Sequence, residues 1–248
     1  MKEKVLFISD VHLGSRGSNA KELLDLLKRE KNLDQLFIVG DFIDGWLLKN
    51  RFYWKSEFTL VIRKILSLAK NGTEVTYVVG NHDDFLRDFI PLTVHENIKI
   101  VNECIWRDYL ITHGDLYDGV IKLKWLGILG SWGYELAIYI DRTLKAFGYR
   151  KSFSKWLKDK VKGAIKFITD FENQLAYQAW SRGLSGVICG HIHTPNRRII
   201  KIHDKEIEYV NCGDWVENNS YILYDETEVG NTNLDFTSDN NNNNTSIV

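Results

Sequence analysis

The stretch Leu36-Phe37-Ile38-Val39-Gly40-Asp41-Phe42-Ile43-Asp44-Gly45-Trp46 decides how the rest of the chain is interpreted. Its apolar run, Leu36 to Val39, predicts a buried strand, and Gly40-Asp41 follows at once. A strand that stops at a carboxylate places that group at the carboxyl edge of a sheet. We therefore expect Asp41 to lie in a site and not in the core.

The same pattern, an apolar strand that ends at a side chain able to bind a metal, occurs four more times. The stretches are Ile8-Ser9-Asp10-Val11-His12, Val79-Gly80-Asn81-His82-Asp83, Thr112-His113-Gly114-Asp115 and Cys189-Gly190-His191-Ile192-His193. We expect these five strand ends to converge on one place.

The segments between the first strands predict helices. Apolar residues at helical spacing indicate amphipathic helices over 20–31 and 58–70, so the N-terminal half reads as an α/β fold with a largely parallel sheet. From residue 187 onward, strands follow one another with short turns, over 187–189, 198–202, 207–210 and 221–224. This change predicts a second sheet with antiparallel pairs.

Composition bounds the class of protein. The 248 residues suffice for one large domain with an insertion, and a formal net charge of -1 gives no global preference for nucleic acid. The three cysteines form no CxxC pair, which favours a reducing compartment. The N-terminus runs straight into a strand without room for a signal peptide, so we expect a cytoplasmic protein.

Residues 117 to 182 carry no strand signal and predict a helical insertion. Between 117 and 166, eleven basic residues stand against four acidic ones, a net charge of +7 in a nearly neutral protein. Lys155, Lys158, Lys162 and Lys166 lie opposite one apolar helical stripe. The longest uncharged run in this segment, 125–134, has ten residues, about half of the roughly 20 that a membrane-spanning helix needs. Two interpretations stay open, a solvated lysine face over a packed subdomain and a surface for an anionic partner.

Taken together, Asp10-x-His12, Gly40-Asp41, Gly80-Asn81-His82-Asp83, His113-Gly114 and Gly190-His191-x-His193 resemble the calcineurin-like metallophosphoesterase superfamily. Each motif alone is weak, but five in the usual order make the resemblance specific. It implies a four-layer α/β/β/α sandwich as the α/β fold. We expect residues 1–116 and 183–225 to form the core, 117–182 a helical cap and 226–248 a disordered polar tail.

The resemblance also implies a pair of metal ions. The first would take Asp10, His12, Asp41 and His193, and the second Asp41, Asn81, His113 and His191, with Asp41 bridging them. Carboxylate, amide and imidazole ligands without thiolate suit Mn²⁺, which we favour, or Fe²⁺ or Zn²⁺. Two such ions bind phosphate oxygens and acidify a shared water, so no protein nucleophile is required.

His82 and Asp44 are the predicted catalytic residues. His82 follows the expected ligand Asn81, and in the superfamily the matching histidine stabilises charge or protonates the leaving oxygen, while Asp44 matches the acid that orients it. The alternatives are a hydrogen-bonding role for His82 behind the ligands and a helix cap for Asp44. Asp83 is open between a cap and a functional role in the same way.

Within the superfamily, Asp10-Val-His-Leu-Gly14, Asp41-x-x-Asp-Gly-Trp46 and Asn211-x-Gly-Asp-Trp215 look like the UDP-2,3-diacylglucosamine diphosphatase group. That resemblance implies release of UMP from a nucleotide-linked glycolipid during lipid A synthesis. Asn81, His82, Lys155, Lys158 and Lys162 would then bind substrate, and the basic cap would bring the protein to the inner membrane as a peripheral protein. Members of that group carry Arg at the position of His82, which leaves the substrate open.

Two other classes of function compete with this one. A phosphodiesterase or nuclease would use the same metals with the basic cap over nucleic acid, although we expect no nucleic-acid partner. A non-catalytic scaffold is the other, and it would be expected to have lost ligands, whereas all seven positions are filled here.

Overall fold

The computed structural model describes residues 3–30, 32–117, 153–226 and 234–238. The chain divides into two compact units, one made of residues 1–115 and 175–248 and the other of residues 116–174. The first unit contains both β-sheets and every predicted metal ligand.

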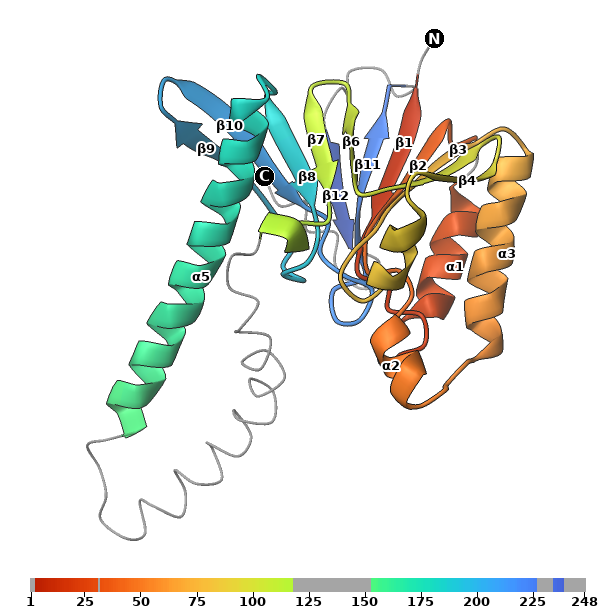
Figure 1. Cartoon of the computed structure of the whole chain (residues 1–248), viewed down its shortest axis with the longest axis horizontal. Helices are drawn as coiled ribbons and strands as arrows, with labels where there is room; N and C mark the ends of the chain where they lie inside the picture. Colours follow the sequence, from red (N-terminus) through yellow and green to blue (C-terminus); the bar gives the residue numbers. More distant parts are fainter. Residues whose placement is uncertain (1–2, 31, 118–152, 227–233, 239–248) are drawn as a thin grey trace, which may run out of the picture. The chain divides into compact units, whose positions relative to one another are not determined.

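The first sheet has seven strands in the order β12-β11-β1-β2-β3-β5-β4 (Figure 1). They are β1 (Lys4–Ile8), β2 (Gln35–Val39), β3 (Glu74–Val78), β4 (Leu92–His95), β5 (Ile98–Val101), β11 (Ser220–Asp225) and β12 (Leu234–Ser238). The neighbours β1, β2, β3 and β5 are parallel, whereas β11 is antiparallel to β1 and β4 to β5. The carboxyl ends of β1, β2 and β3 therefore meet at one edge.

The second sheet has five strands in the order β6-β7-β8-β10-β9. They are β6 (Glu103–Trp106), β7 (Tyr109–Thr112), β8 (Gly186–Cys189), β9 (Asn196–Ile202) and β10 (Lys205–Asn211). Here β8 is parallel to both β7 and β10, and the two outer pairs are antiparallel. The expected second sheet is confirmed with one correction: the strand expected at 221–224 is β11, and it belongs to the first sheet. β11 has apolar residues on both faces and pairs with β1, which buries it at a position that the second sheet does not offer.

The helices are α1 (Ala20–Arg29), α2 (Gly45–Asn50), α3 (Ser56–Lys70) and α5 (Phe153–Ser181), with short 3₁₀ turns η1 (Asp84–Phe89) and η2 (Asp115–Tyr117). Figure 1 shows α1 and α3 side by side on one face of the first sheet. Their buried leucine, isoleucine and valine residues recur at helical spacing, as the sequence predicts. The predicted α/β fold is thus confirmed, and both of its sheets are mixed.

The central strands are apolar throughout because both of their faces are buried. Leu6 and Leu36 belong to the core that packs against α1 and α3, whereas Phe7 and Phe37 belong to the core between the sheets. The rings of Phe7 and Phe37 stack with centroids 4.9 Å apart, and Trp106 of the second sheet meets Phe7 edge-on. Two apolar cores therefore lie between three layers, which are the helices α1 and α3, the first sheet and the second sheet.

Two segments bear on the expected tail and cap. β12 lies within the segment expected to be disordered and pairs with β11, so these five residues differ from that expectation. The three lysines predicted to bind substrate are Lys155, Lys158 and Lys162, and their side chains lie outside the part of the chain that the structure describes. No helix in the described ranges has the length and apolarity needed to cross a membrane.

Candidate metal centre

Seven predicted ligands come together where five strands end. They follow β1 (Asp10, His12), β2 (Asp41), β3 (Asn81), β7 (His113) and β8 (His191, His193). Six of these seven residues, all except Asn81, fall into the groups Asp10–His12–His193, His12–Asp44–His82 and Asp41–His113–His191, and within each group the candidate ligand atoms lie within 4.8 Å of one another. Parallel pairing of β1 with β2, and of β7 with β8, explains why residues far apart in sequence share this edge.

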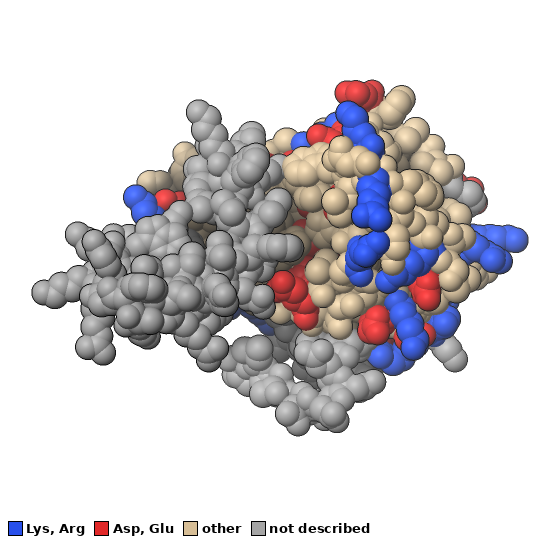
Figure 2. Space-filling view, turned by 90° about the horizontal axis from the view of Figure 1, so that it is seen from below, with Lys and Arg blue, Asp and Glu red and all other residues tan. Residues whose placement is uncertain are grey.

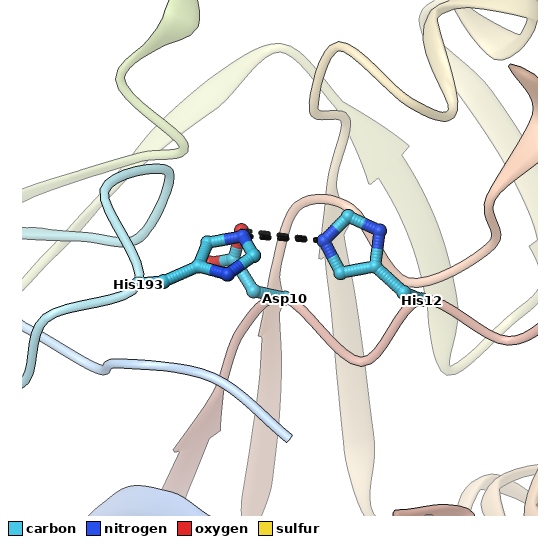
Figure 3. Close-up of side chains that lie close together, drawn as sticks. All are labelled: Asp10, His12 and His193. Atoms are coloured by element: carbon cyan, nitrogen blue, oxygen red, sulfur yellow. Dashed lines mark hydrogen bonds and ion pairs between the residues drawn. The ribbon is translucent and has the colours of Figure 1, made fainter. Parts of the chain in front are cut away.

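The first group contains Asp10, His12 and His193 (Figure 3). Asp10 Oδ1 lies 3.1 Å from His193 Nε2 and 3.9 Å from His12 Nε2, and the two imidazole Nε2 atoms are 3.3 Å apart. One carboxylate oxygen and two ring nitrogens thus point into the same small space.

The group of Asp41, His113 and His191 is joined to the group of Asp10, His12 and His193 through Asp41. Its Oδ2 lies 3.3 Å from His113 Nε2, in the group with His191, and 4.0 Å from His12 Nε2 in the first group. The carboxylate is almost wholly buried. Asp41 therefore lies between the two groups, as a ligand shared by two ions would.

Three buried polar atoms support a metal at this place. Asp10 Oδ1, Asn81 Oδ1 and His113 Nε2 are all inaccessible to solvent. Asp10 Oδ1 and His113 Nε2 meet only other candidate ligands, His193 and Asp41, and Asn81 Oδ1 has no hydrogen-bond partner among the described residues. Leaving such an atom unpaired costs about 1–3 kcal/mol. Each is an atom through which its residue would bind an ion, and the set of carboxylate, amide and imidazole donors suits Mn²⁺, Fe²⁺ or Zn²⁺. The residues therefore fit a dinuclear metal site.

The backbone is strained where the ligands lie. Asp10, His12, Asp41, His191 and His193 all have φ between +50° and +74°, in the left-handed region. This conformation costs a residue other than glycine about 1–2 kcal/mol. It is held by neighbouring loops, since Asp10 N donates to Gly40 O at 3.1 Å and His12 N to Asp41 O at 2.9 Å. Strain of this kind clusters at functional sites, where it turns side chains to one point.

Glycines before three of the ligands permit close approach. A Cβ on Gly40 would lie 2.3 Å from His113 Nδ1, and one on Gly80 would lie 2.3 Å from Asp41 Oδ1. On Gly190 it would lie 1.9 Å from Ser9 Oγ. The loops can therefore pack against one another only because these positions lack a side chain.

The remaining ring nitrogens of two histidines are fixed by hydrogen bonds. His113 Nδ1 lies 2.9 Å from the carbonyl oxygen of Val39, and His12 Nδ1 lies 3.3 Å from Asp44 Oδ2. Because Nδ1 carries the proton in these bonds, Nε2 is the nitrogen that faces the centre and would bind an ion. This arrangement orients both rings for binding a cation.

Asp44 also lies against His82, the other predicted catalytic residue. Its Oδ1 is 3.1 Å from His82 Nδ1 and accepts a hydrogen bond from Leu47 N at 2.9 Å, at the start of α2. The cap expected as an alternative is thus present together with the contact to His82. Burial lowers the pKa of His82, but the hydrogen bond to Asp44 and the charge of Asp41 outweigh it and raise the pKa above its ordinary value.

His82 is the more exposed member of this pair. Its side chain is 25% exposed, its backbone N–H donates to Asp41 Oδ1 at 2.7 Å, and the Trp46 ring lies 4.3 Å from its own ring. His82 Nε2 lies 4.0 Å from Asp41 Oδ2. The ring therefore stands at the mouth of the centre with a raised pKa.

In the metal-free chain the carboxylates and imidazoles stabilise each other's charges. Burial alone would raise the pKa of Asp10, but the positive charges of His193 and His113 lower it to about 2. Burial would likewise lower the pKa of His193, yet the charge and hydrogen bond of Asp10 raise it to about 9. The pKa of Asp41 is lowered and that of His113 raised for the same reason.

Asp83 and Tyr77 support the centre, and Tyr77 was not predicted. The fully buried Asp83 accepts hydrogen bonds from Gly80 N at 2.6 Å, from Phe42 N at 2.8 Å and from the Tyr77 hydroxyl. Burial, together with the negative charge of Asp41, raises its pKa to about 6. Asp83 thus ties the Asn81 loop to the Asp41 loop and is not a side-chain cap of η1. A polar ring within an apolar strand is the signal that could have pointed to Tyr77.

Asn211 supports the loop of His191 and His193. Its buried amide nitrogen donates to Gly190 O at 2.7 Å, and its oxygen accepts from Gly213 N at 2.9 Å. Asn218, held by Asp214, donates to His193 O at 2.8 Å. These residues therefore shape the wall of the centre without being among the candidate ligands.

Comparisons with known proteins find relatives that match most of the chain. The chain is 25% identical to the UDP-2,3-diacylglucosamine hydrolase of Porphyromonas gingivalis (strain ATCC BAA-308 / W83), covering 92% of this chain and 96% of that protein. It is 26% identical to the enzyme of the same name from Pseudomonas syringae pv. syringae (strain B728a), covering 94% and 96%. A solved structure of wild-type Vps29 complexed with Zn²⁺ from Entamoeba histolytica matches 95% of this chain and 91% of its own, at 13% identity and a TM-score of 0.45. The profile of the family described as calcineurin-like phosphoesterase matches residues 3–195, so the chain belongs to the calcineurin-like phosphoesterase family.

Proposed function

We propose that this protein is a dinuclear metal-dependent hydrolase of phosphoric esters or pyrophosphates. The observation that carries the proposal is the convergence of buried ligand atoms at the ends of five strands, among them Asp10 Oδ1 and His113 Nε2, which meet only other candidate ligands, and Asn81 Oδ1, which has no partner among the described residues. A scaffold that had lost its metals would not be expected to keep so many buried ionisable groups together with an unpaired amide oxygen.

Asp10, His12, Asp41 and His193 would hold one divalent ion, and Asp41, Asn81, His113 and His191 the other. When bound, the pair supplies positive charge for the phosphate oxygens and acidifies water enough for attack near neutral pH. We favour Mn²⁺, with Fe²⁺ or Zn²⁺ as alternatives.

His82 and Asp44 would act on the leaving group. His82 Nε2, at the mouth of the centre, is placed to donate a hydrogen bond or a proton to the leaving oxygen. Asp44 holds the opposite nitrogen of the same ring and also orients His12. Asn81, next to His82, would contact both an ion and the substrate phosphate.

The substrate we propose is UDP-2,3-diacylglucosamine or a related nucleotide-linked glycolipid, cleaved at its pyrophosphate to UMP and a lipid sugar phosphate. Relatives of that name match more than nine-tenths of this chain and of their own length, which supports a shared substrate class. His82 can provide a positive charge at the phosphate because its pKa is raised.

The test is to incubate the Mn²⁺-loaded protein with UDP-2,3-diacylglucosamine and measure UMP, with Asp41→Asn as the inactive control. We expect UMP and no UDP. Hydrolysis of bis-p-nitrophenyl phosphate without UMP release would keep the hydrolase and reject the glycolipid. A metal-loaded protein that cleaves neither compound would favour a scaffold.

A further inference from the structure

Arg87 joins two of the loops that carry predicted metal ligands. It lies in η1, in the loop that carries Asn81, and its Nη2 donates a hydrogen bond to Asp115 Oδ2 at 2.7 Å. Asp115 closely follows His113 and begins η2. The same nitrogen donates to the carbonyl oxygen of Val79 at 3.2 Å, just before the Asn81 loop. One guanidinium group therefore bonds the Asn81 loop to the His113 loop.

The two loops come from different sheets. Asn81 follows β3 of the first sheet, whereas His113 follows β7 of the second. The hydrogen bonds of a sheet run between its own strands, so they do not set the distance between two sheets that face each other. The ion pair of Arg87 and Asp115 crosses that interval next to both predicted ligands. It can therefore hold one sheet edge against the other where the second ion would bind.

Arg87 completes a set of links among the ligand loops of the second ion. Three of the four ligands predicted for that ion are Asp41, Asn81 and His113. The buried Asp83 already links the Asn81 loop to the Asp41 loop, because it accepts hydrogen bonds from both. Arg87 supplies the link from the Asn81 loop to the His113 loop.

The surroundings of Arg87 differ from those of a surface cation. Figure 2 looks at the end of the core at which β1, β2 and β3 finish, where lysine and arginine side chains extend from the surface. The side chain of Arg87 is only 23% exposed and that of Asp115 only 9%. Nε of Arg87 is inaccessible to solvent and has no hydrogen-bond partner among the described residues. Burying a guanidinium with an unpaired N–H lowers stability, so the stability of the fold does not by itself account for it.

We propose that Arg87 is a positioning residue, whose ion pair with Asp115 holds Asn81 and His113 at the separation that the second metal ion requires. The inference rests on the proposed function, since it concerns two ligands of the dinuclear centre. Arg87 acts through Val79 and Asp115, which flank the ligands, and not by contact with the ion or the substrate.

The first ion should not depend on Arg87. Its predicted ligands follow β1, β2 and β8, so none of them lies on the Asn81 loop or the His113 loop. They are Asp10, His12, Asp41 and His193. Loss of Arg87 should therefore weaken one ion and spare the other, which a general loss of stability would not do.

The test is calorimetric titration of Mn²⁺ into the metal-free full chain, followed by electron paramagnetic resonance. We expect the wild type to bind two ions and to show the exchange-coupled spectrum of a Mn²⁺ pair. Arg87→Gln should bind one ion as the wild type does and the other about 10- to 100-fold more weakly, the usual effect of removing a group that orients a metal ligand. At a Mn²⁺ concentration between its two dissociation constants, its spectrum should be that of isolated Mn²⁺.

A double-mutant cycle with Asp115→Asn shows whether the two residues act through each other. If they do, the double variant should bind the second ion no more weakly than the weaker single variant, because either substitution already breaks the pair. If Asp115→Asn lowers the affinity by the same factor in the wild type and in Arg87→Gln, the charge of Asp115 acts on the ion by itself, and the proposal is overturned.

Arg87→Lys is the second variant, and it serves if Arg87→Gln does not fold. It keeps the positive charge, but an ammonium group lacks the fixed donor geometry of the guanidinium. We therefore expect Arg87→Lys to bind the second ion more tightly than Arg87→Gln and more weakly than the wild type. Wild-type affinity for both ions in Arg87→Lys and in every Arg87→Gln protein that folds would overturn the proposal.

Arg107→Gln is the matched control, because Arg107 also joins the two sheets. It lies in the turn between β6 and β7, and its Nη2 lies 2.8 Å from Glu3 Oε2 before β1 and 2.6 Å from Glu226 Oε1 after β11. This link is at the opposite end of β7 from His113. Arg107→Gln should lower the melting temperature and leave both Mn²⁺ affinities unchanged. Equal weakening of the second ion in Arg107→Gln and Arg87→Gln would overturn the proposal.

The proposed function and this inference can fail separately. A wild type that binds two Mn²⁺ ions but cleaves no phosphoric ester would reject the hydrolase, while selective loss of the second ion in Arg87→Gln would still support positioning. A wild type that cleaves its substrate, with both ions unchanged in Arg87→Gln, would keep the hydrolase and overturn the role of Arg87.

Discussion

Asp44 is the residue whose carboxylate contacts both the predicted metal ligand His12 and the predicted catalytic residue His82. Because it contacts both His12 and His82, Asp44→Asn should reduce hydrolysis by about 10- to 100-fold, the usual effect of removing a group that orients a ligand. Its hydrogen bond from Leu47 N can be kept by the amide, so the melting temperature should change little. If the free energy of unfolding fell by as much as the activation free energy of hydrolysis rose, Asp44 would act on the fold and not on the site.

The charge and the proton of His82 can be separated by two substitutions. His82→Gln removes both and should lower kcat by about 10²-fold or more. His82→Arg restores only a positive charge. We expect His82→Arg to recover substrate binding, measured as KM. Its kcat should no longer depend on the protonation of residue 82. Equal kcat in all three proteins, measured from pH 6 to 10, would exclude a catalytic role for this residue.

Metal binding should release protons, because His193 of the metal-free chain has a pKa of about 9 and is protonated at pH 7. Adding Mn²⁺ in weak buffer at pH 7 should release at least about one proton per chain, and this release should disappear above pH 9 to 10. His193→Gln should release fewer protons, whereas His203→Gln, on the turn between β9 and β10, should leave the count unchanged. Proton uptake, or release that is independent of pH, would contradict the site.

The same pKa values set the pH dependence of the metal-free fold. The pKa of His193 is raised, so its contribution to the free energy of unfolding is full below about pH 6.5 and is lost as pH rises through 9. That of Asp10 is lowered to about 2, so its contribution is full above about pH 4 and is lost as pH falls through 2. The metal-free protein should therefore melt highest between these limits, and bound metal should move the maximum to higher pH.

At the scale of elements, replacing Gly40, the glycine before Asp41, tests whether close packing of the loops is needed for metal binding. Gly40 and Gly183 both have left-handed backbone, at φ +83° and +77°, but only at Gly40 would a Cβ meet another residue, His113. Both alanine variants should lose about 1 kcal/mol of stability from backbone strain. Gly40→Ala should in addition lose metal, measured by metal content after dialysis. Equal metal content in the two variants would show that the loops have room to move.

At the scale of the whole molecule, residues 117–166 of the insertion have a net charge of +7 in a protein whose net charge is -1, and we propose that the insertion binds an anionic membrane surface. Replacing Lys155, Lys158, Lys162 and Lys166 by Gln should weaken binding to phosphatidylglycerol vesicles by about 1 kcal/mol per lysine while leaving hydrolysis of a small soluble diester unchanged. The matched control replaces four exposed lysines of the core, Lys28, Lys70, Lys201 and Lys205, and should bind vesicles as the wild type does. Equal losses of vesicle binding in both variants would show that the effect depends on net charge alone.

The sequence by itself determined the alternation of strands and helices, the strand ends at which Asp10, Asp41, Asn81, His113 and His191 lie, and the polarised charge of the insertion. These follow from local rules, because an apolar run and the polar residue that ends it are neighbours in the chain. Only the tertiary structure decided that β11 joins the first sheet, that Asp44 contacts two histidines, and that Tyr77 and Asp83 tie two loops together. Such contacts depend on which strands pair and how closely loops pack, and that choice is made by the burial of both sheet faces at once, which no single stretch of sequence contains.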